Sequence, residues 1–243
     1  LYNDANAGTG VSSMTVQVQN SVSKSVGMER MFMNTYSVMN SLSNLTRVDD
    51  AGKNNFFFMC NEMTHEVMML QEPDYIPSET VDNTPYDKDI ETRYDINGIH
   101  MIVDSGVKAA HYDCNMSAMI QLSNWFDYLR AEGVYDNTRI IIVSDHGTSG
   151  GQFKQLLIDD TFDAQEVTAL LMVKDFNATG FEISDEFMTN ADTPSLAMQG
   201  IIDNPTNPFT GKAINSDEKL AHDQLVLHCK DAMPTFRDGN TYP

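Results

Sequence analysis

The chain has 243 residues, of which 41% are apolar, so it can bury a core of the size that a globular domain needs. Its 15 basic and 35 acidic residues give a formal net charge of −20, which argues against nucleic acid as a partner, because nucleic-acid binding requires a basic surface. Its three cysteines match no zinc-ribbon or CxxC spacing, and their odd number argues against a disulfide framework. No stretch reaches the roughly 20 apolar residues that span a bilayer.

The first segments of the chain predict a loop and then a helix. Residues 1–27 are rich in Asn, Ser, Gly and Thr, and predict a loop with at most one edge strand. Residues 28–45 place Met, Val and Leu at helical spacing, which predicts an amphipathic helix. Methionines cluster within residues 28–39 and 59–69, and they favour adaptable core packing over a binding surface.

A second apolar run is followed by a histidine. Residues 55–60, NFFFMC, predict a buried strand in which Cys60 packs as a small apolar side chain. The next polar run contains His65, which could be a metal ligand, a phosphate-binding donor, a general acid or an ordinary loop histidine. Residues 71–93 are rich in proline and acids, and predict a long irregular loop.

Residues 105–132 show the clearest helical pattern. An apolar face runs through this stretch, and Gly133 is placed to end the helix. His111 lies near the predicted helix start, where backbone N–H groups favour anions. This histidine either contacts an anionic substrate or simply caps the helix.

Residues 138–147, TRIIIVSDHG, predict a buried strand that ends in a carboxylate and an imidazole. The β-branched run is typical of a strand covered on both faces, as in a parallel sheet. Open α/β sheets place ligand sites at the carboxyl ends of their strands, and Asp145 and His146 are suitable ligands for a divalent cation. Gly147 allows the backbone to turn away. The alternative is a surface turn in which both side chains cap the next segment.

The rest of the chain completes an alternating pattern. Residues 148–164 predict a loop with a short helix, and residues 167–173 predict a third buried strand. Residues 192–202 predict a short helix, and residues 204–212 a loop. Helix or strand is undecided in the tail beyond residue 215, where the spacing of His222 and His228 does not indicate a metal site. Three buried strands alternating with helices predict an α/β fold, a three-layer sandwich with a largely parallel central sheet.

Several motifs, taken in order, resemble one family. They are WFDYLR at 125–130, GVYDNT at 133–138, SDHG at 144–147, NFFFMCNEMTHE at 55–66, AAHY at 109–112, NADTPSL at 190–196 and NPFTGK at 207–212. The stretch from about 54 to 212 resembles the sulfatase branch of the alkaline phosphatase superfamily. Within it, the motifs look most like the membrane-anchored lipoteichoic acid synthases and phosphoethanolamine transferases.

This resemblance implies an alkaline-phosphatase-like fold and a role for each candidate residue. Asp145 and His146 would bind a divalent metal, which could be Mn, Mg, Zn or Ca. His65 and His111 would be catalytic, contacting the anionic group of the substrate or its leaving oxygen. The implied substrate is a phosphate or sulfate ester.

The chain also departs from the family pattern. The family's nucleophile lies in an earlier βα unit, and Thr9, Ser12, Ser13 and Thr15 have no apolar strand before them, so no nucleophile is identified. Cys60 is not in the C-x-P-x-R setting of sulfatases that form formylglycine. The loop after Gly147 lacks the Glu or Asn that often comes shortly after this motif in the family.

The expected organisation has three parts: a loop-rich segment with one helix at 1–53, a sulfatase-like core at 54–214 and an unassigned tail at 215–243. The core would be the C-terminal part of a catalytic domain, so its partners would be the missing N-terminal half and the membrane, through an absent anchor. The expected location is extracytoplasmic, at the cell surface or released from a membrane-anchored precursor.

Three functions remain open. The first is a metal-dependent phospho- or sulfo-ester transferase or hydrolase, present here as a fragment that is inactive alone. The second is a non-catalytic sulfatase-like module that binds or builds a surface assembly. The third is a cytoplasmic α/β enzyme such as a metal-dependent phosphomutase of the same superfamily.

Overall fold

The computed structural model describes residues 28–50, 52–89, 91–148, 150–158 and 162–223. These residues fall into two compact units. The first unit comprises the described parts of residues 1–138 and 150–161, and the second those of residues 139–149 and 162–243. The edge strand expected within residues 1–27, the hydroxyl residues considered there, and His228 lie outside the described residues.

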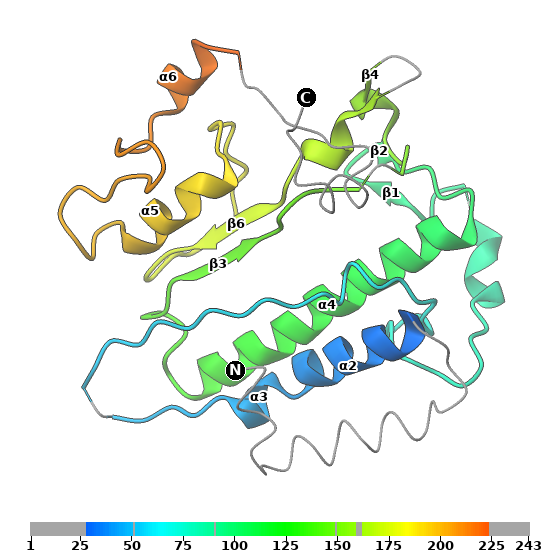
Figure 1. Cartoon of the computed structure of the whole chain (residues 1–243). Helices are drawn as coiled ribbons and strands as arrows, with labels where there is room; N and C mark the ends of the chain where they lie inside the picture. Colours follow the sequence, from blue (N-terminus) through cyan, green and yellow to red (C-terminus); the bar gives the residue numbers. More distant parts are fainter. Residues whose placement is uncertain (1–27, 51, 90, 149, 159–161, 224–243) are drawn as a thin grey trace, which may run out of the picture. The chain divides into compact units, whose positions relative to one another are not determined.

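Three helices dominate the first unit: α2 (Met28–Asn40), α3 (Leu42–Leu45) and α4 (Gly106–Ala131) (Figure 1). The helices predicted from residues 28–45 and 105–132 are thus confirmed, the first with a break at Ser41. Helix α4 begins after Ser105, whose side chain accepts a hydrogen bond from the Lys108 N–H. It ends before Gly133, which has a φ of 72° and gives the left-handed turn that glycine favours after a helix.

The core of the first unit lies between these helices and the extended chain that crosses them. Helices α2 and α3 pack on α4, and the segment around Met63 and Leu70 packs between them. The expected role of the methionines is confirmed for Met33, Met39 and Met63, which are buried in this core, whereas Met31 and Met69 are exposed. The core residues are Phe32, Met33, Met39, Leu42, Met63, Leu70, Cys114 and Ala118.

Short elements complete the first unit: η1 (Thr84–Asp89), β1 (Asp95–Ile96), β2 (Ile99–His100), η2 (Lys154–Leu156) and β4 (Leu157–Ile158). Strands β1 and β2 form an antiparallel hairpin. Asn97 and Gly98 join them with φ angles of 50° and 80°, the left-handed conformation that an Asn-Gly hairpin turn requires.

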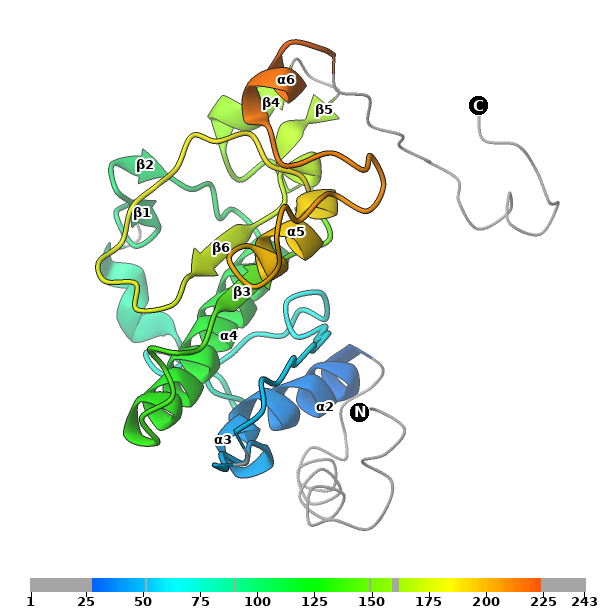
Figure 2. The same ribbon diagram turned by 90° about the vertical axis from the view of Figure 1, so that its left-hand side faces the viewer.

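The second unit is built on two antiparallel strands, β3 (Ile140–Val143) and β6 (Leu171–Lys174). Ile140 pairs with Lys174 and Val143 with Leu171. Helix α5 (Thr193–Met198) lies beside β3 in both views (Figures 1 and 2). The remaining elements are β5 (Phe162–Asp163), η3 (Ala164–Val167), η4 (Asn190–Asp192) and α6 (Ser216–Leu220).

Two features of the predicted sheet are not found among the described residues. Residues 55–60 run extended without joining a sheet, their three phenylalanines are 54–75% exposed, and Cys60 is exposed rather than packed. Strand β3 is half-buried rather than covered on both faces, and its partner β6 is antiparallel. An apolar run without periodicity indicates a strand, but it does not specify which strand pairs with it or in which direction.

No described helix has both the length and the apolar character needed to cross a membrane.

Candidate functional site

The loop after β3, residues 144–147, is held in place by the chain that leads into β6. The backbone N–H of Ser144 donates to the Leu170 carbonyl at 3.1 Å, and its hydroxyl accepts from the Leu170 N–H at 2.8 Å. The N–H of Gly147 donates to the Glu166 carbonyl at 3.0 Å. Both ends of this loop are therefore attached to the same neighbouring segment.

Gly147 is required by close backbone packing. A Cβ atom at this position would lie 1.9 Å from the Gln165 carbonyl oxygen and 3.0 Å from that of Thr168. No side chain fits there unless the backbone moves. The sequence suggested that this glycine lets the chain turn away from the strand. The structure adds a second reason for glycine, the close approach of the backbone at residues 165 and 168.

Asp145 and His146 present two ligand atoms on the same side of the loop. The Nδ1 of His146 lies 2.5 Å from the Gly147 carbonyl oxygen, which can only accept, so Nδ1 carries the proton and the lone pair is on Nε2. This Nε2 lies 3.6 Å from Asp145 Oδ2. The Asp145 side chain is 88% exposed and the His146 side chain 62% exposed, so Asp145 Oδ2 and His146 Nε2 are both open to a ligand.

This spacing fits a divalent cation. Two ligand atoms at about 2.1 Å from one ion in tetrahedral geometry lie about 3.4 Å apart. The donor set, one carboxylate oxygen and one neutral imidazole, suits Zn²⁺ or Mn²⁺. Within the part of the chain that the structure describes, no group of three or more His, Cys, Asp or Glu side chains forms a complete metal site. Asp145 and His146 thus form a two-ligand pair.

Two polar side chains hold this loop and strand within the second unit. The Asn190 side-chain amide donates to the Asp145 carbonyl oxygen at 2.7 Å. Arg139, at the start of β3, donates to the Leu196, Ala197 and Gln199 carbonyls at the end of α5. Its other guanidinium nitrogens bind Asp175, at 2.8 and 3.0 Å.

His65 and His111, both in the first unit, are brought near each other by two side chains of α4. Asp113 accepts a hydrogen bond from the Leu70 N–H at 3.0 Å. The Cys114 thiol accepts from the Met68 N–H at 3.2 Å and donates to the Met68 carbonyl at 3.3 Å. These bonds hold the segment after His65 against the helix that carries His111.

The environments of the two histidines differ. Burial lowers the pKa of His111, and the charge of His65 lowers it further. His111 is therefore neutral at pH 7, and one of its ring nitrogens is a hydrogen-bond donor. His65 is exposed, and its Nδ1 lies 3.2 Å from the buried carboxylate of Glu66.

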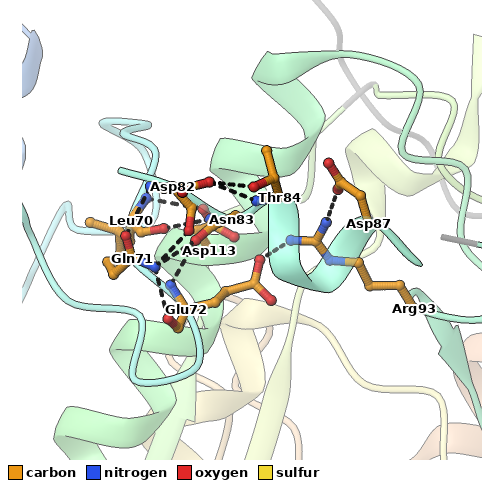
Figure 3. Close-up of polar contacts among 9 residues, drawn as sticks. All are labelled: Leu70, Gln71, Glu72, Asp82, Asn83, Thr84, Asp87, Arg93 and Asp113. Carbon is orange, nitrogen blue, oxygen red and sulfur yellow. Dashed lines mark hydrogen bonds and ion pairs between the residues drawn. The ribbon is translucent and has the colours of Figure 1, made fainter. Parts of the chain in front are cut away.

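A partly buried polar network, which reaches α4 at Asp113, was not anticipated from the sequence (Figure 3). The Asn83 side-chain oxygen accepts a hydrogen bond from the Glu72 N–H at 3.0 Å, and its side-chain amide donates to the Leu70 carbonyl at 2.8 Å. Glu72 forms an ion pair with Arg93, which also binds Asp87 at 2.7 Å. The predicted irregular loop is therefore an ordered structure held by its own polar side chains.

A second unanticipated network joins two motifs in the second unit. The Asn207 side-chain amide donates to Asp192 Oδ1 at 3.2 Å, so the NADTPSL and NPFTGK motifs meet at a buried carboxylate. The Asn207 side-chain oxygen also accepts from the N–H groups of Phe209 and Thr210. An Asx turn of this kind is the signal that could have been read from the sequence.

The sequence model of one protein family, described as Sulfatase, matches residues 3–197, more than three quarters of the chain. The chain belongs to the sulfatase family. This membership confirms the resemblance to the alkaline phosphatase superfamily and implies its α/β fold. Neither a curated protein nor a solved structure matches the chain. All four candidate residues of this sulfatase-family protein lie within the match, His65 and His111 in the first unit and Asp145 and His146 in the second.

Proposed function

We propose that this sulfatase-family chain is part of a metal-dependent hydrolase or transferase that acts on phosphate or sulfate esters outside the cytoplasm. The observation that carries the proposal is the Asp145–His146 pair. The Gly147 carbonyl holds the His146 proton on Nδ1, which leaves Nε2 free at 3.6 Å from Asp145 Oδ2. Family membership supports the reaction class, the cleavage or transfer of an ester group.

Each candidate pair would have a role that its own chemistry allows. Asp145 and His146 would hold the cation, which could be Mn, Mg, Zn or Ca and would neutralise charge on the ester oxygens. His111, neutral because it is half-buried, would donate a hydrogen bond to an anionic oxygen. His65, exposed and beside Glu66, would donate to the same group or to the leaving oxygen.

The nucleophile is proposed to come from a segment that precedes residue 54, because in the family it lies in an earlier βα unit. We further propose that the whole protein is close to the membrane-anchored branch, at the cell surface or released from it, since the 125–147 motifs look most like that branch.

The test is cleavage of p-nitrophenyl phosphate and p-nitrophenyl sulfate with added Mn²⁺ or Zn²⁺, using the chain extended on its N-terminal side to include a βα unit with a nucleophile. Asp145→Ala is expected to abolish turnover in this extended protein, and His111→Gln to lower it about 10²–10⁴-fold. Turnover that survives Asp145→Ala unchanged would contradict the proposal.

One observation favours a second function, a non-catalytic binding module. Asp145 and His146 have no third acidic, histidine or cysteine partner among the described residues. A module of this kind would retain the fold and its surface interactions when Asp145 is replaced. An extended protein that folds normally, binds no Mn²⁺ or Zn²⁺ and cleaves neither ester would support this alternative.

A further inference from the structure

Within the second unit, a buried ion pair joins the part that the family model matches to a segment beyond the match. The match ends at residue 197, and α6 lies after it. From α6, the Lys219 ammonium donates to Asp192 Oδ2 at the N-terminal end of α5. The Asp192 side chain is 1% exposed, and Lys219 is 21% exposed, so this contact is shielded from water.

Asp192 gathers hydrogen bonds from three separate segments. Besides Lys219, its carboxylate accepts from the Thr189 N–H at 2.8 Å, the Thr189 hydroxyl at 3.0 Å and the Asn207 amide at 3.2 Å. Burial alone would raise the pKa of Asp192, but these donors outweigh it and hold the pKa below its ordinary range. The carboxylate is therefore ionised, and removing the Lys219 ammonium would leave a buried charge without its cationic partner.

The network reaches the loop of the candidate metal pair in one further step. Thr189 and Asp192 form a capping box, which sets the conformation of the residues between them. Asn190 is one of these residues, and its amide donates to the Asp145 carbonyl at 2.7 Å. The contacts thus run from Lys219 through Asp192 and the capping box to the backbone of Asp145, all within the second unit.

We propose that Lys219 is a positioning residue for the Asp145–His146 pair. It holds Asp192, Asp192 holds the capping box, and the capping box holds Asn190 against the Asp145 carbonyl. This keeps Asp145 Oδ2 and His146 Nε2 at the spacing of two ligands to one cation. The inference rests on the proposed function, and it extends the functional domain into a segment that the family match leaves out.

The segment supplies its own control. Lys212 and Glu218 form a second lysine–carboxylate pair close in sequence to the first, but their side chains are 64% and 45% exposed. An exposed pair of this kind contributes little to stability. The Lys212 ammonium donates to Glu218 and lies outside the chain of contacts that leads to Asn190 and Asp145. Lys212→Met therefore removes a lysine from the same segment without touching the proposed connection.

The experiment compares the full chain with Lys219→Met, Lys219→Arg, Lys212→Met and Asn190→Ala variants, without metal. The readouts are hydrogen exchange of the peptide containing residues 144–147 and ¹⁵N NMR of the His146 tautomer. In Lys219→Met we expect exchange at least about tenfold faster and loss of the Nδ1–H tautomer. Lys219→Arg keeps the charge, so it should retain the slow exchange of residues 144–147 and the Nδ1–H tautomer of His146. Lys212→Met should also leave both readouts unchanged.

Asn190→Ala separates positioning from general unfolding. It removes an exposed side chain, so the second unit stays folded, and we expect the same changes at His146 while exchange in residues 207–219 stays slow. The proposal is overturned if His146 and residues 144–147 are unaffected in Lys219→Met or in Asn190→Ala. Titration of each variant with Mn²⁺ alone is the separate test of function: a chain that shows the expected coupling and binds no Mn²⁺ upholds positioning and contradicts the metal role.

Discussion

The carboxylate of Asp113 on α4 accepts the backbone N–H of Leu70 at 3.0 Å, across 43 positions of sequence. Asp113 is almost fully buried, and burial raises the pKa of its carboxyl to about 6, against the lowering effect of this hydrogen bond. One side chain therefore both connects the His65 segment to α4 and titrates in an accessible pH range.

The first prediction concerns the pH dependence of stability. Because the folded pKa of Asp113 lies above the unfolded value, the folded state binds more protons between about pH 4 and pH 6. The contribution of Asp113 to the stability of the folded state is therefore largest below pH 4, and it is lost as the pH rises through 6. The unfolding free energy of Asp113→Asn minus that of wild type should therefore increase by roughly 2–3 kcal/mol between pH 4 and pH 7. A difference that does not change with pH, measured by urea unfolding, would rule this out.

The second prediction tests the proximity of the two histidines. The charge of His65 lowers the pKa of His111, so His65→Gln should raise the pKa of His111. Proton NMR titration of the His111 ring measures this directly. His100→Gln is the matched control, because His100 is paired with Asp95 on the β1–β2 hairpin. Equal His111 titration curves in wild type and His65→Gln would show that the two rings do not interact.

The third prediction concerns Gly147. Gly147→Ala places a Cβ against the Gln165 carbonyl, so the loop must move, at a cost of about 1–3 kcal/mol. Gly106→Ala, at the first residue of α4 where a Cβ meets nothing within 4 Å, should be neutral or slightly stabilising. Thermal unfolding of both variants is the measurement. Equal stability of the two would mean that residues 144–147 do not approach residue 165 in solution.

The fourth prediction concerns Arg139. Its planar guanidinium reaches the α5 carbonyls and Asp175 simultaneously, which a lysine ammonium cannot reproduce. Arg139→Lys should cost about 1–3 kcal/mol, since the partly buried Leu196 and Ala197 carbonyls lose their donor. Arg130→Lys, at an exposed pair with Asp127, should cost less than about 1 kcal/mol. Chemical denaturation that ranks the two variants the other way would contradict this role.

The helices of the chain were predictable because their signals are local. The 28–45 and 105–132 patterns and Gly133 predicted α2 with α3, and α4, almost at their observed limits. The short 192–202 helix was also recovered, as η4 and α5. Periodicity, caps and a terminal glycine act within a few residues, so a short window of sequence contains them.

The strands were predicted less well because pairing is not local. Residues 140–143 do form a strand, but no pattern in them specifies β6 as an antiparallel partner. The strand predicted at 167–173 is observed at Leu171–Lys174, because the chain before it forms η3 at residues 164–167, which Asp163 caps. The β1–β2 hairpin was missed although Asn97-Gly98 is a strong turn signal, since its two-residue strands lack any alternation to read.

The sequence suggested the residues of the candidate site, but not the side chains that hold them in place. The SDHG motif indicated Asp145 and His146, and the Gly147 carbonyl that orients His146 is the kind of partner such a ligand requires. Asn190, Arg139 and Lys219 were not identified, because each acts on a partner more than 25 residues away. Side chains that bind distant carbonyls or carboxylates leave no periodic trace in the sequence.

The most direct measurement is titration of the chain with Mn²⁺ and Zn²⁺ up to millimolar concentration, followed by NMR of the histidine rings and by thermal stability. In wild type we predict that Zn²⁺ shifts the His146 resonances, Mn²⁺ broadens them, and both ions raise Tm. Asp145→Ala/His146→Ala should lose these effects, whereas Asp95→Ala/His100→Ala, at another exposed Asp–His pair, should keep them. Absence of any metal effect at His146, or an equal rise in Tm in the Asp145→Ala/His146→Ala variant, would contradict a metal site at the end of β3.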